Sequence, residues 1–269
     1  MPFGLCYSGV LPLETTTVIK RLLFTFLILS FCLTLLARDK KIIRIGFPED
    51  FPPFYSLNAE NEYEGISFEV VSRALRNLDY KIEVKQFDNM STLFSEVKKG
   101  SVDAIVNLTA TKDRKQFLDF TTNPHVYESQ DLISLKTSPF TYTGSLLSLS
   151  RYKVGVIHGW THGKDFDSAD FLQKVYVLDS KKQLQGLLSG RFDLIVNNRH
   201  YFNELAQKSG VALIFSHHAP SLEDLPVTVG ISKLYPESEK LVEKLNVEIS
   251  EFKLTEEYRL LLKGSGLSR

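Results

Sequence analysis

One pattern occurs twice in this chain, and it restricts the folds that the chain can adopt. The segments "VKKGSVDAIVN" (97–107) and "LLSGRFDLIVN" (187–197) share the order helix end, Gly, spacer, hydrophobic residue, Asp, three apolar residues and Asn. They lie 90 residues apart, which is too long for a solenoid unit and suits one lobe of a domain. Two common helix–turn–strand units could match by chance. The repeat favours two similar lobes that face each other.

Strand and helix patterns alternate in both halves of the chain. Strands are predicted over 42–47, 80–87, 102–106, 152–159, 175–179 and 192–198, and helices over 66–78, 91–99, 164–174 and 180–190, the last with Ser180 as its cap. This order predicts an α/β fold with mostly parallel sheets. The extended segments 128–136 and 225–233 remain to cross between the lobes, and two crossings predict a hinge. The C-terminal helices are expected to return to the first lobe.

The charge balance argues against nucleic-acid binding. The 269-residue chain has 32 basic and 32 acidic residues and no basic block. Its length allows two modest lobes.

The first 37 residues have the character of a leader. Lys20 and Arg21 precede an uncharged apolar run that ends at Ala37, after which charge returns. This order is typical of a signal peptide cleaved after Ala37. An uncleaved anchor needs ~20 apolar residues, more than the run provides. Lipidation at Cys32 is a third interpretation, although Phe31 is larger than the small residue expected just before a lipidated cysteine.

Cysteine chemistry is excluded from the exported part. Cys6 and Cys32 are the only cysteines, and both lie in the leader. The mature chain therefore has no disulfide, thiolate metal site or thiol nucleophile.

Polar residues follow the two repeated strands. Ligands of open α/β sheets gather at the carboxyl ends of strands, so Asn107 and Asn198 are expected to line a cleft. Arg114 follows the first of these strands, after Thr109 and Thr111. Its guanidinium offers a planar fork that matches a carboxylate. Thr111 is expected to cap the turn that carries Arg114.

Several motifs resemble one family. "DFPPF", "EGISFEVV", "VDAIVNLTATKDRKQFLDFT", "YKVGVIHGWT" and "VTVGISK" are similar, in this order, to bacterial extracytoplasmic solute-binding proteins of the polar amino-acid type, family 3. The resemblance covers nearly all of 41–264. It implies a two-lobed periplasmic-binding-protein fold of type II, each lobe a mostly parallel sheet flanked by helices, joined by two hinge strands. The expected bounds are 38–133 with 228–269 for lobe 1, and 134–227 for lobe 2.

The resemblance also implies a ligand site. Arg114 matches the arginine that clamps the ligand's α-carboxylate. Thr109 matches the residue whose backbone N–H and hydroxyl bind the same carboxylate. Phe51 matches an aromatic that stacks on the ligand, with a core phenylalanine as the alternative. Met90 stands where a second aromatic is common. The second-lobe turn that touches the carboxylate matches Gly159, Trp160 and Thr161, with Trp160 either a ligand wall or simply buried.

Two positions depart from the family pattern. Asn198 stands where a second-lobe aspartate pairs with the ligand's ammonium, and Pro48 replaces a first-lobe carboxylate. An amide carries no charge, so an ammonium there is less well compensated. Glu49, Asp50 or Glu69 could substitute, or the ligand could lack an ordinary ammonium. Ser67 stands where aspartate is common in the family, and the simplest interpretation is that it caps the helix.

The resemblance implies capture of a small carboxylate-bearing solute, an amino acid or derivative, by hinge closure in the periplasm, for the permease of an ABC transporter. We expect a monomer with no cofactor, no metal and no catalytic activity. His158 and His162 lie four apart, but the glutamate of a zinc motif is absent. The alternatives are a dehydratase-like enzyme that uses Glu69, and a ligand sensor or orphan binding protein. The sequence does not identify the ligand.

Overall fold

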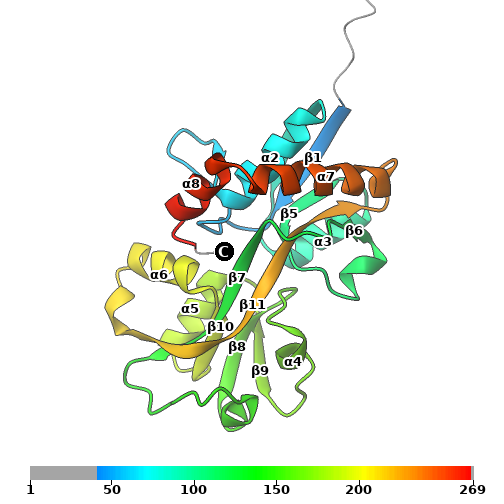
Figure 1. The fold of residues 1–269 in the computed structure, drawn as a ribbon. Helices are drawn as coiled ribbons and strands as arrows, with labels where there is room; N and C mark the ends of the chain where they lie inside the picture. The colour runs from blue at the N-terminus through cyan, green and yellow to red at the C-terminus, as the bar shows by residue number, and fades with distance from the viewer. Residues whose placement is uncertain (1–40, 268–269) are drawn as a thin grey trace, which may run out of the picture. The chain divides into compact units, whose positions relative to one another are not determined.

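The computed structural model describes residues 41–267. The predicted leader, with its cleavage site and Cys32, lies outside this range. Two lobes, each an α/β layer, are connected by two long strands (Figure 1).

The first lobe is built on three parallel strands. β1 (Lys41–Phe47) lies between β4 (Tyr80–Gln86) and β5 (Ala104–Leu108). The connections are α2 (Ile66–Asn77) and α3 (Met90–Lys98). The apolar face of α2 packs into the first-lobe core with Ile43 and Ile45 of β1. The predicted strands and helices of this half are confirmed to within a few residues.

The second lobe repeats this plan. β8 (Lys153–Ile157) lies between β9 (Gln173–Val177) and β10 (Leu194–Asn197), again all parallel. The helices are α4 (Lys164–Asp167), α5 (Ser180–Leu188) and α6 (Arg199–Lys208). In each lobe, the strand that opens the lobe occupies the middle of the parallel set.

Two long antiparallel strands connect the lobes. β7 (Val126–Leu135) pairs along most of its length with β11 (Phe215–Ser232), with a register shift between His218 and Glu223. β11 also pairs with β5, and β7 also pairs with β10, so each lobe receives one antiparallel strand. The order across the sheet is β4-β1-β5-β11-β7-β10-β8-β9. The two crossing segments are therefore the predicted hinge strands.

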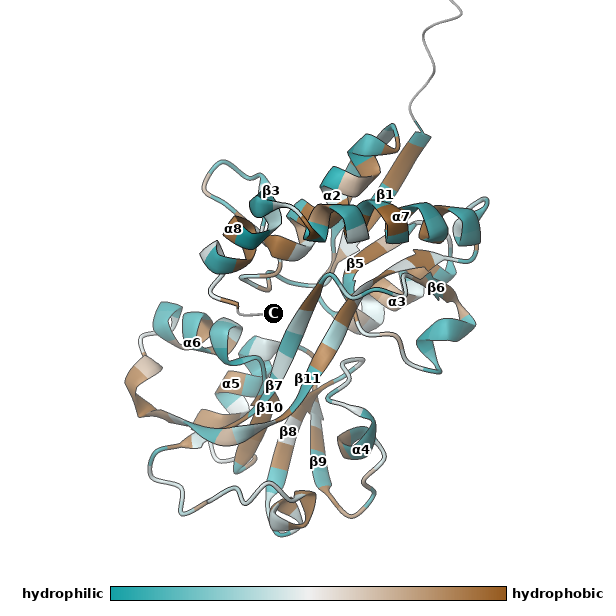
Figure 2. Ribbon diagram, in the orientation of Figure 1, coloured by the Kyte–Doolittle hydropathy of each residue, from teal (hydrophilic) through white to brown (hydrophobic). Residues whose placement is uncertain are grey.

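The C-terminal helices pack on the first lobe. α7 (Ser238–Lys253) contributes Leu241, Leu245 and Ile249 to the core beneath α2, and α8 (Glu256–Gly264) contributes Tyr258. Figure 2 shows hydrophobic residues along β1 and hydrophilic ones over much of α6. The remaining short elements are β2 (Ser56–Leu57), β3 (Tyr63–Glu64), β6 (Leu118–Phe120), η1 (Arg114–Gln116), η2 (Leu146–Leu149) and η3 (Ala212–Ile214). No helix within residues 41–267 is both long and apolar enough to cross a membrane.

The repeated sequence pattern forms the same structure in both lobes. Gly100 and Gly190 follow α3 and α5 with φ of +76° and +71°. The repeated spacing then places an aspartate beside the strand that opens each lobe. Asp103 accepts from the N–H of Arg44 at 2.8 Å, and Asp193 accepts from the N–H of Lys153 at 2.8 Å. Both aspartates therefore fasten the incoming strand to the middle strand.

Three local predictions are corrected. The helix predicted over 164–174 is only four residues long, because Gln173–Val177 pairs with β8 as strand β9 and Lys174 Nζ donates to the carbonyl of Asp167 at 2.7 Å. The cap of α5 is Asp179, whose side chain accepts from the N–H of Lys182, whereas Ser180 lies inside the helix. Helix α6 had no counterpart in the prediction, which treated Asn198 as a ligand contact.

Candidate ligand-binding site

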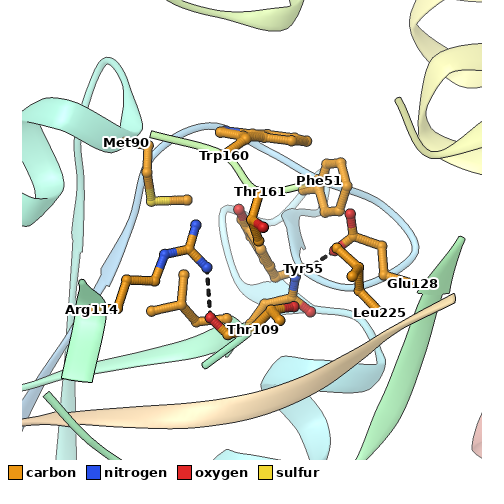
Figure 3. A pocket seen from close by; sticks show the side chains of 11 residues that line it. Phe51, Tyr55, Met90, Thr109, Arg114, Glu128, Trp160, Thr161 and Leu225 are labelled. Atoms are coloured by element: carbon orange, nitrogen blue, oxygen red, sulfur yellow. Dashed lines mark hydrogen bonds between the residues drawn. The ribbon is translucent and has the colours of Figure 1, made fainter. Parts of the chain in front are cut away.

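A small cavity lies where the strand ends of the two lobes meet the hinge strands. Its volume is about 30 Å³, room for roughly one or two water molecules. Figure 3 shows its wall. The lining residues are Phe51, Tyr55, Met90, Asn107, Leu108, Thr109, Arg114, Glu128, Trp160, Thr161 and Leu225.

Arg114 is held from both lobes. Its side chain is buried, and Nη1 donates to the carbonyl of Thr109 at 2.7 Å while Nη2 donates to the carbonyl of Gly159 at 2.8 Å. The Phe94 ring lies 5.4 Å from its guanidinium carbon. Burial lowers the pKa of Arg114 to about 10, so it stays charged at neutral pH. A guanidinium has five N–H donors, so donors remain for an anion in the cavity.

The threonines around Arg114 have separate tasks. Thr109 lines the cavity, and its hydroxyl donates to the carbonyl of Pro226 on β11 at 3.0 Å. The Thr111 hydroxyl accepts from the N–H of Arg114 at 3.3 Å, which is the predicted cap of this turn. Thr109 therefore fastens the end of β5 to a hinge strand.

An aromatic cluster covers one side of the cavity. Phe51 has 1% of its surface exposed and packs on Trp160, Tyr201 and Phe54 at centroid distances of 5.0, 4.6 and 5.2 Å. Trp160 packs partly buried against the cores of both lobes while lining the cavity. Phe51 and Trp160 therefore line the cavity and also pack against the core, and their contact with a ligand stays a prediction.

The turn after β8 approaches the first lobe closely. Gly159 has φ of +83°, and a Cβ there would lie 3.2 Å from Met90, so a side chain would be strained and crowded. Gly159 does not line the cavity itself but contributes its carbonyl to Arg114. It lines an adjoining hollow of about 390 Å³, which shares Arg114, Trp160 and Thr161 with the cavity.

Asn198 lies outside the cavity. It is fully buried, and its Oδ1 accepts from the N–H groups of His200 and Tyr201, so it caps α6. Its Nδ2 donates to Ser129 of β7. An asparagine after a strand and before a helix is also the usual sign of an N-cap.

The acidic residues proposed as substitutes for Asn198 also lie elsewhere. Glu69 is exposed on α2 and does not line the cavity. Glu49 accepts from the Ser180 hydroxyl at 3.1 Å and the Tyr201 hydroxyl at 3.3 Å, and burial raises its pKa. Asp50 lines a separate interlobe hollow. Ser67 is not a cap, because its hydroxyl donates to Asn107 at 2.6 Å.

The carboxylate in the cavity is Glu128, which the sequence analysis treated only as part of a hinge strand. Its side chain is buried at the wall of the cavity. The signal that was available is the spacing of Glu128 and Gln130 in this strand, since residues two apart point to the same face. Among residues 41–267, no group of three or more metal-binding side chains is found.

Comparison with known proteins agrees with this geometry. Residues 43–264 match the family model for bacterial extracellular solute-binding proteins, family 3. The ABC transporter arginine-binding protein 1 of Escherichia coli (strain K12) is 24% identical over 244 residues, covering 89% of this chain and 96% of that protein. A probable histidine-binding protein of Neisseria gonorrhoeae is 28% identical over 137 residues, 51% of this chain and about half (49%) of that protein.

The fold has close structural counterparts. An ancestral arginine-binding protein bound to arginine superposes with a TM-score of 0.71 at 21% identity, covering 85% of this chain and 99% of that one. The family match spans both lobes and the hinge. The chain therefore belongs to family 3 of the bacterial extracellular solute-binding proteins.

Proposed function

We propose that the chain binds an amino acid or a related small carboxylate in the interlobe cavity and presents it to the permease of an ABC transporter. The observation that carries the proposal is Arg114, a buried and charged fork with free donors in the wall of the cavity. Such a group binds a carboxylate far better than water-exposed arginine does, because the surroundings screen the charge less. The relatives named for arginine and histidine binding support the same ligand class.

The lobe contacts support capture by closure. Glu49 of the first lobe accepts from Ser180 and Tyr201 of the second, Phe51 contacts Trp160, and Arg114 reaches Gly159. The cavity is smaller than an amino acid, so a ligand has to extend into the adjoining hollow or hold the lobes farther apart than they lie here. Contacts made only after closure then stabilise the closed form.

The crossover points follow from the cores. Val126 packs in the first-lobe core, whereas Leu132 and Ile133 pack in the second. On the return strand, Phe215 belongs to the second lobe and Val227 to the first. We therefore propose the two lobes expected from the sequence, 38–133 with 228–269 and 134–227, with both crossings moved earlier. The first crossing lies between Val126 and Leu132 rather than after 133, and the return lies between Phe215 and Val227 rather than after 227.

We further propose an exported, monomeric, non-catalytic protein that acts in the periplasm after removal of residues 1–37. The periplasmic name of related binding proteins supports this location. The description of the family as solute-binding proteins supports the proposed lack of catalytic activity.

A thermal-shift screen tests the function. Ligands that bind only the native state raise the melting temperature. The panel contains the twenty amino acids, their α-keto acids and small carboxylates. A selective upward shift with at least one amino acid or related carboxylate is expected, and a panel without any shift would refute the proposed ligand class.

A further inference from the structure

Glu128 is a carboxylate that the proposed carboxylate clamp does not use. It lies on hinge strand β7, with 9% of its surface exposed. Among the described residues that line the cavity, Glu128 is the only acidic one and Arg114 the only basic one. Figure 3 shows the two toward opposite ends of the cavity. A ligand that spans the cavity therefore meets a cation at one end and an anion at the other.

The partners of Glu128 are neutral. Gln130 Nε2 donates to its Oε1 at 2.6 Å, and Asn107 Nδ2 makes a longer contact to Oε2 at 3.4 Å. Neither amide compensates the charge of the carboxylate. Within the part of the chain that the structure describes, no lysine or arginine forms an ion pair with it.

Both amides are oriented by groups behind them. The Ser67 hydroxyl donates to Asn107 Oδ1 at 2.6 Å, which turns Asn107 Nδ2 toward Glu128. His162 Nδ1 lies 2.7 Å from Gln130 Oε1, which turns Gln130 Nε2 toward Glu128. Two hydrogen-bond chains, one from each lobe, thus end in donors aimed at the same carboxylate. An arrangement of this kind is preorganised for an anion.

Burial makes this anion costly until a cation arrives. Burial raises the pKa of Glu128 to about 7, against the opposing effects of the Gln130 and Asn107 hydrogen bonds and the Arg114 charge. The other titratable group that faces it is Tyr55, from the loop after β1. His162 reaches it only through Gln130. A cationic ligand group beside Glu128 supplies the missing charge.

Asn198 is not available to bind a cationic group of the ligand, which leaves Glu128 for this task. Asn198 carries no charge and is occupied in capping α6, but its amide donates to Ser129, the neighbour of Glu128 on β7. The second-lobe strand end and the hinge strand thus meet at this point. We infer that Glu128 binds the cationic nitrogen of the ligand, so that the site selects solutes that carry an ammonium group together with a carboxylate. This inference rests on the proposed function.

Calorimetric titration of matched ligands tests it. Each amino acid that shifts the melting temperature is titrated beside its own α-keto acid, which keeps the carboxylate and lacks the ammonium. The wild-type protein is expected to prefer the amino acid at least tenfold, and Glu128→Gln is expected to remove most of this preference. Glu223→Gln is the matched control, because Glu223 is a carboxylate on the other hinge strand that does not line the cavity.

Proton release gives a second readout. At pH 6.5, ammonium binding beside Glu128 drives the carboxylate to its ionised form, so titrations in buffers of different ionisation enthalpy should show proton release. Glu128→Gln should abolish that release, and Glu223→Gln should keep it.

The outcomes separate the two claims. If the wild-type protein binds α-keto acids with the same affinity as the matching amino acids, this result alone overturns the role of Glu128. Unchanged affinity, preference and proton release in Glu128→Gln overturn it too and leave the proposed function standing. A wild-type protein that binds no amino acid refutes the proposed function and the inference together.

Discussion

At the scale of single residues, two charged side chains define the cavity, and the sequence pointed to only one. Arg114 follows a strand and two threonines, a context that marks it as a clamp. Glu128 lies within a hinge strand, where a polar residue is ordinarily a solvent-facing one, and only its burial in the cavity wall shows that it faces inward. Burial, rather than residue type, gives this carboxylate its properties.

Replacing Glu128 should change the pH dependence of stability. Its pKa is about 7 in the folded protein and near 4.5 when unfolded, so the folded state holds a proton that the unfolded state releases between these values. The contribution of Glu128 to stability is thus fully present below pH 4.5 and is lost as pH rises through about 7. The free energy of unfolding of Glu128→Gln, relative to that of wild type, should therefore rise by roughly 2–3 kcal/mol from pH 5 to pH 8, as measured by urea unfolding. Parallel pH profiles for the two proteins would contradict this account.

Replacing Asn198 with aspartate should alter little. The carboxylate still accepts from the N–H groups of His200 and Tyr201, and a negative charge at the start of α6 is favourable. The lost donation to Ser129 offsets part of that gain. Titration should show the ligand preference of wild type, with stability changed by no more than about 1 kcal/mol. A strong new preference for ammonium-bearing ligands in Asn198→Asp would place this side chain in the cavity.

At the scale of elements, the regular units were predictable and the loops next to the cavity were not. Glycine after a helix and an apolar run after the glycine predicted α3–β5 and α5–β10, because local chain propensity and burial agree there. The short α4 follows from the segment after it, because Gln173–Val177 pairs with β8 as strand β9. Pairing with β8 overrides the helical pattern of 164–174 and leaves no trace in its periodicity.

The repeated aspartates offer a matched test of the two lobes. Asp103 accepts from the Arg44 backbone N–H and from both Nε and Nη2 of its side chain, whereas Asp193 accepts from the Lys153 backbone N–H. Asp103→Ala should therefore destabilise by about 2–3 kcal/mol, and Asp193→Ala by about 1 kcal/mol. Chemical denaturation measures both, and equal losses would show that the side-chain pair with Arg44 contributes nothing.

At the scale of the whole described molecule, the cavity belongs to neither lobe alone. Arg114 comes from the first lobe, Trp160 and Thr161 from the second, and Glu128 and Leu225 from the two hinge strands. A change in the hinge therefore alters the distance between lobes and the position of an anionic side chain at the same time. This coupling makes the hinge part of the recognition surface.

The measurement that tests the account most directly is ligand affinity in Arg114→Ala, with Arg114→Lys beside it. The alanine variant should keep a cooperative unfolding transition and lose about 100-fold or more in affinity for a carboxylate ligand identified with wild type. The lysine variant keeps the charge without the planar fork, so it should recover only part of the loss. Wild-type affinity in a folded Arg114→Ala protein would remove Arg114 from the site and contradict the account.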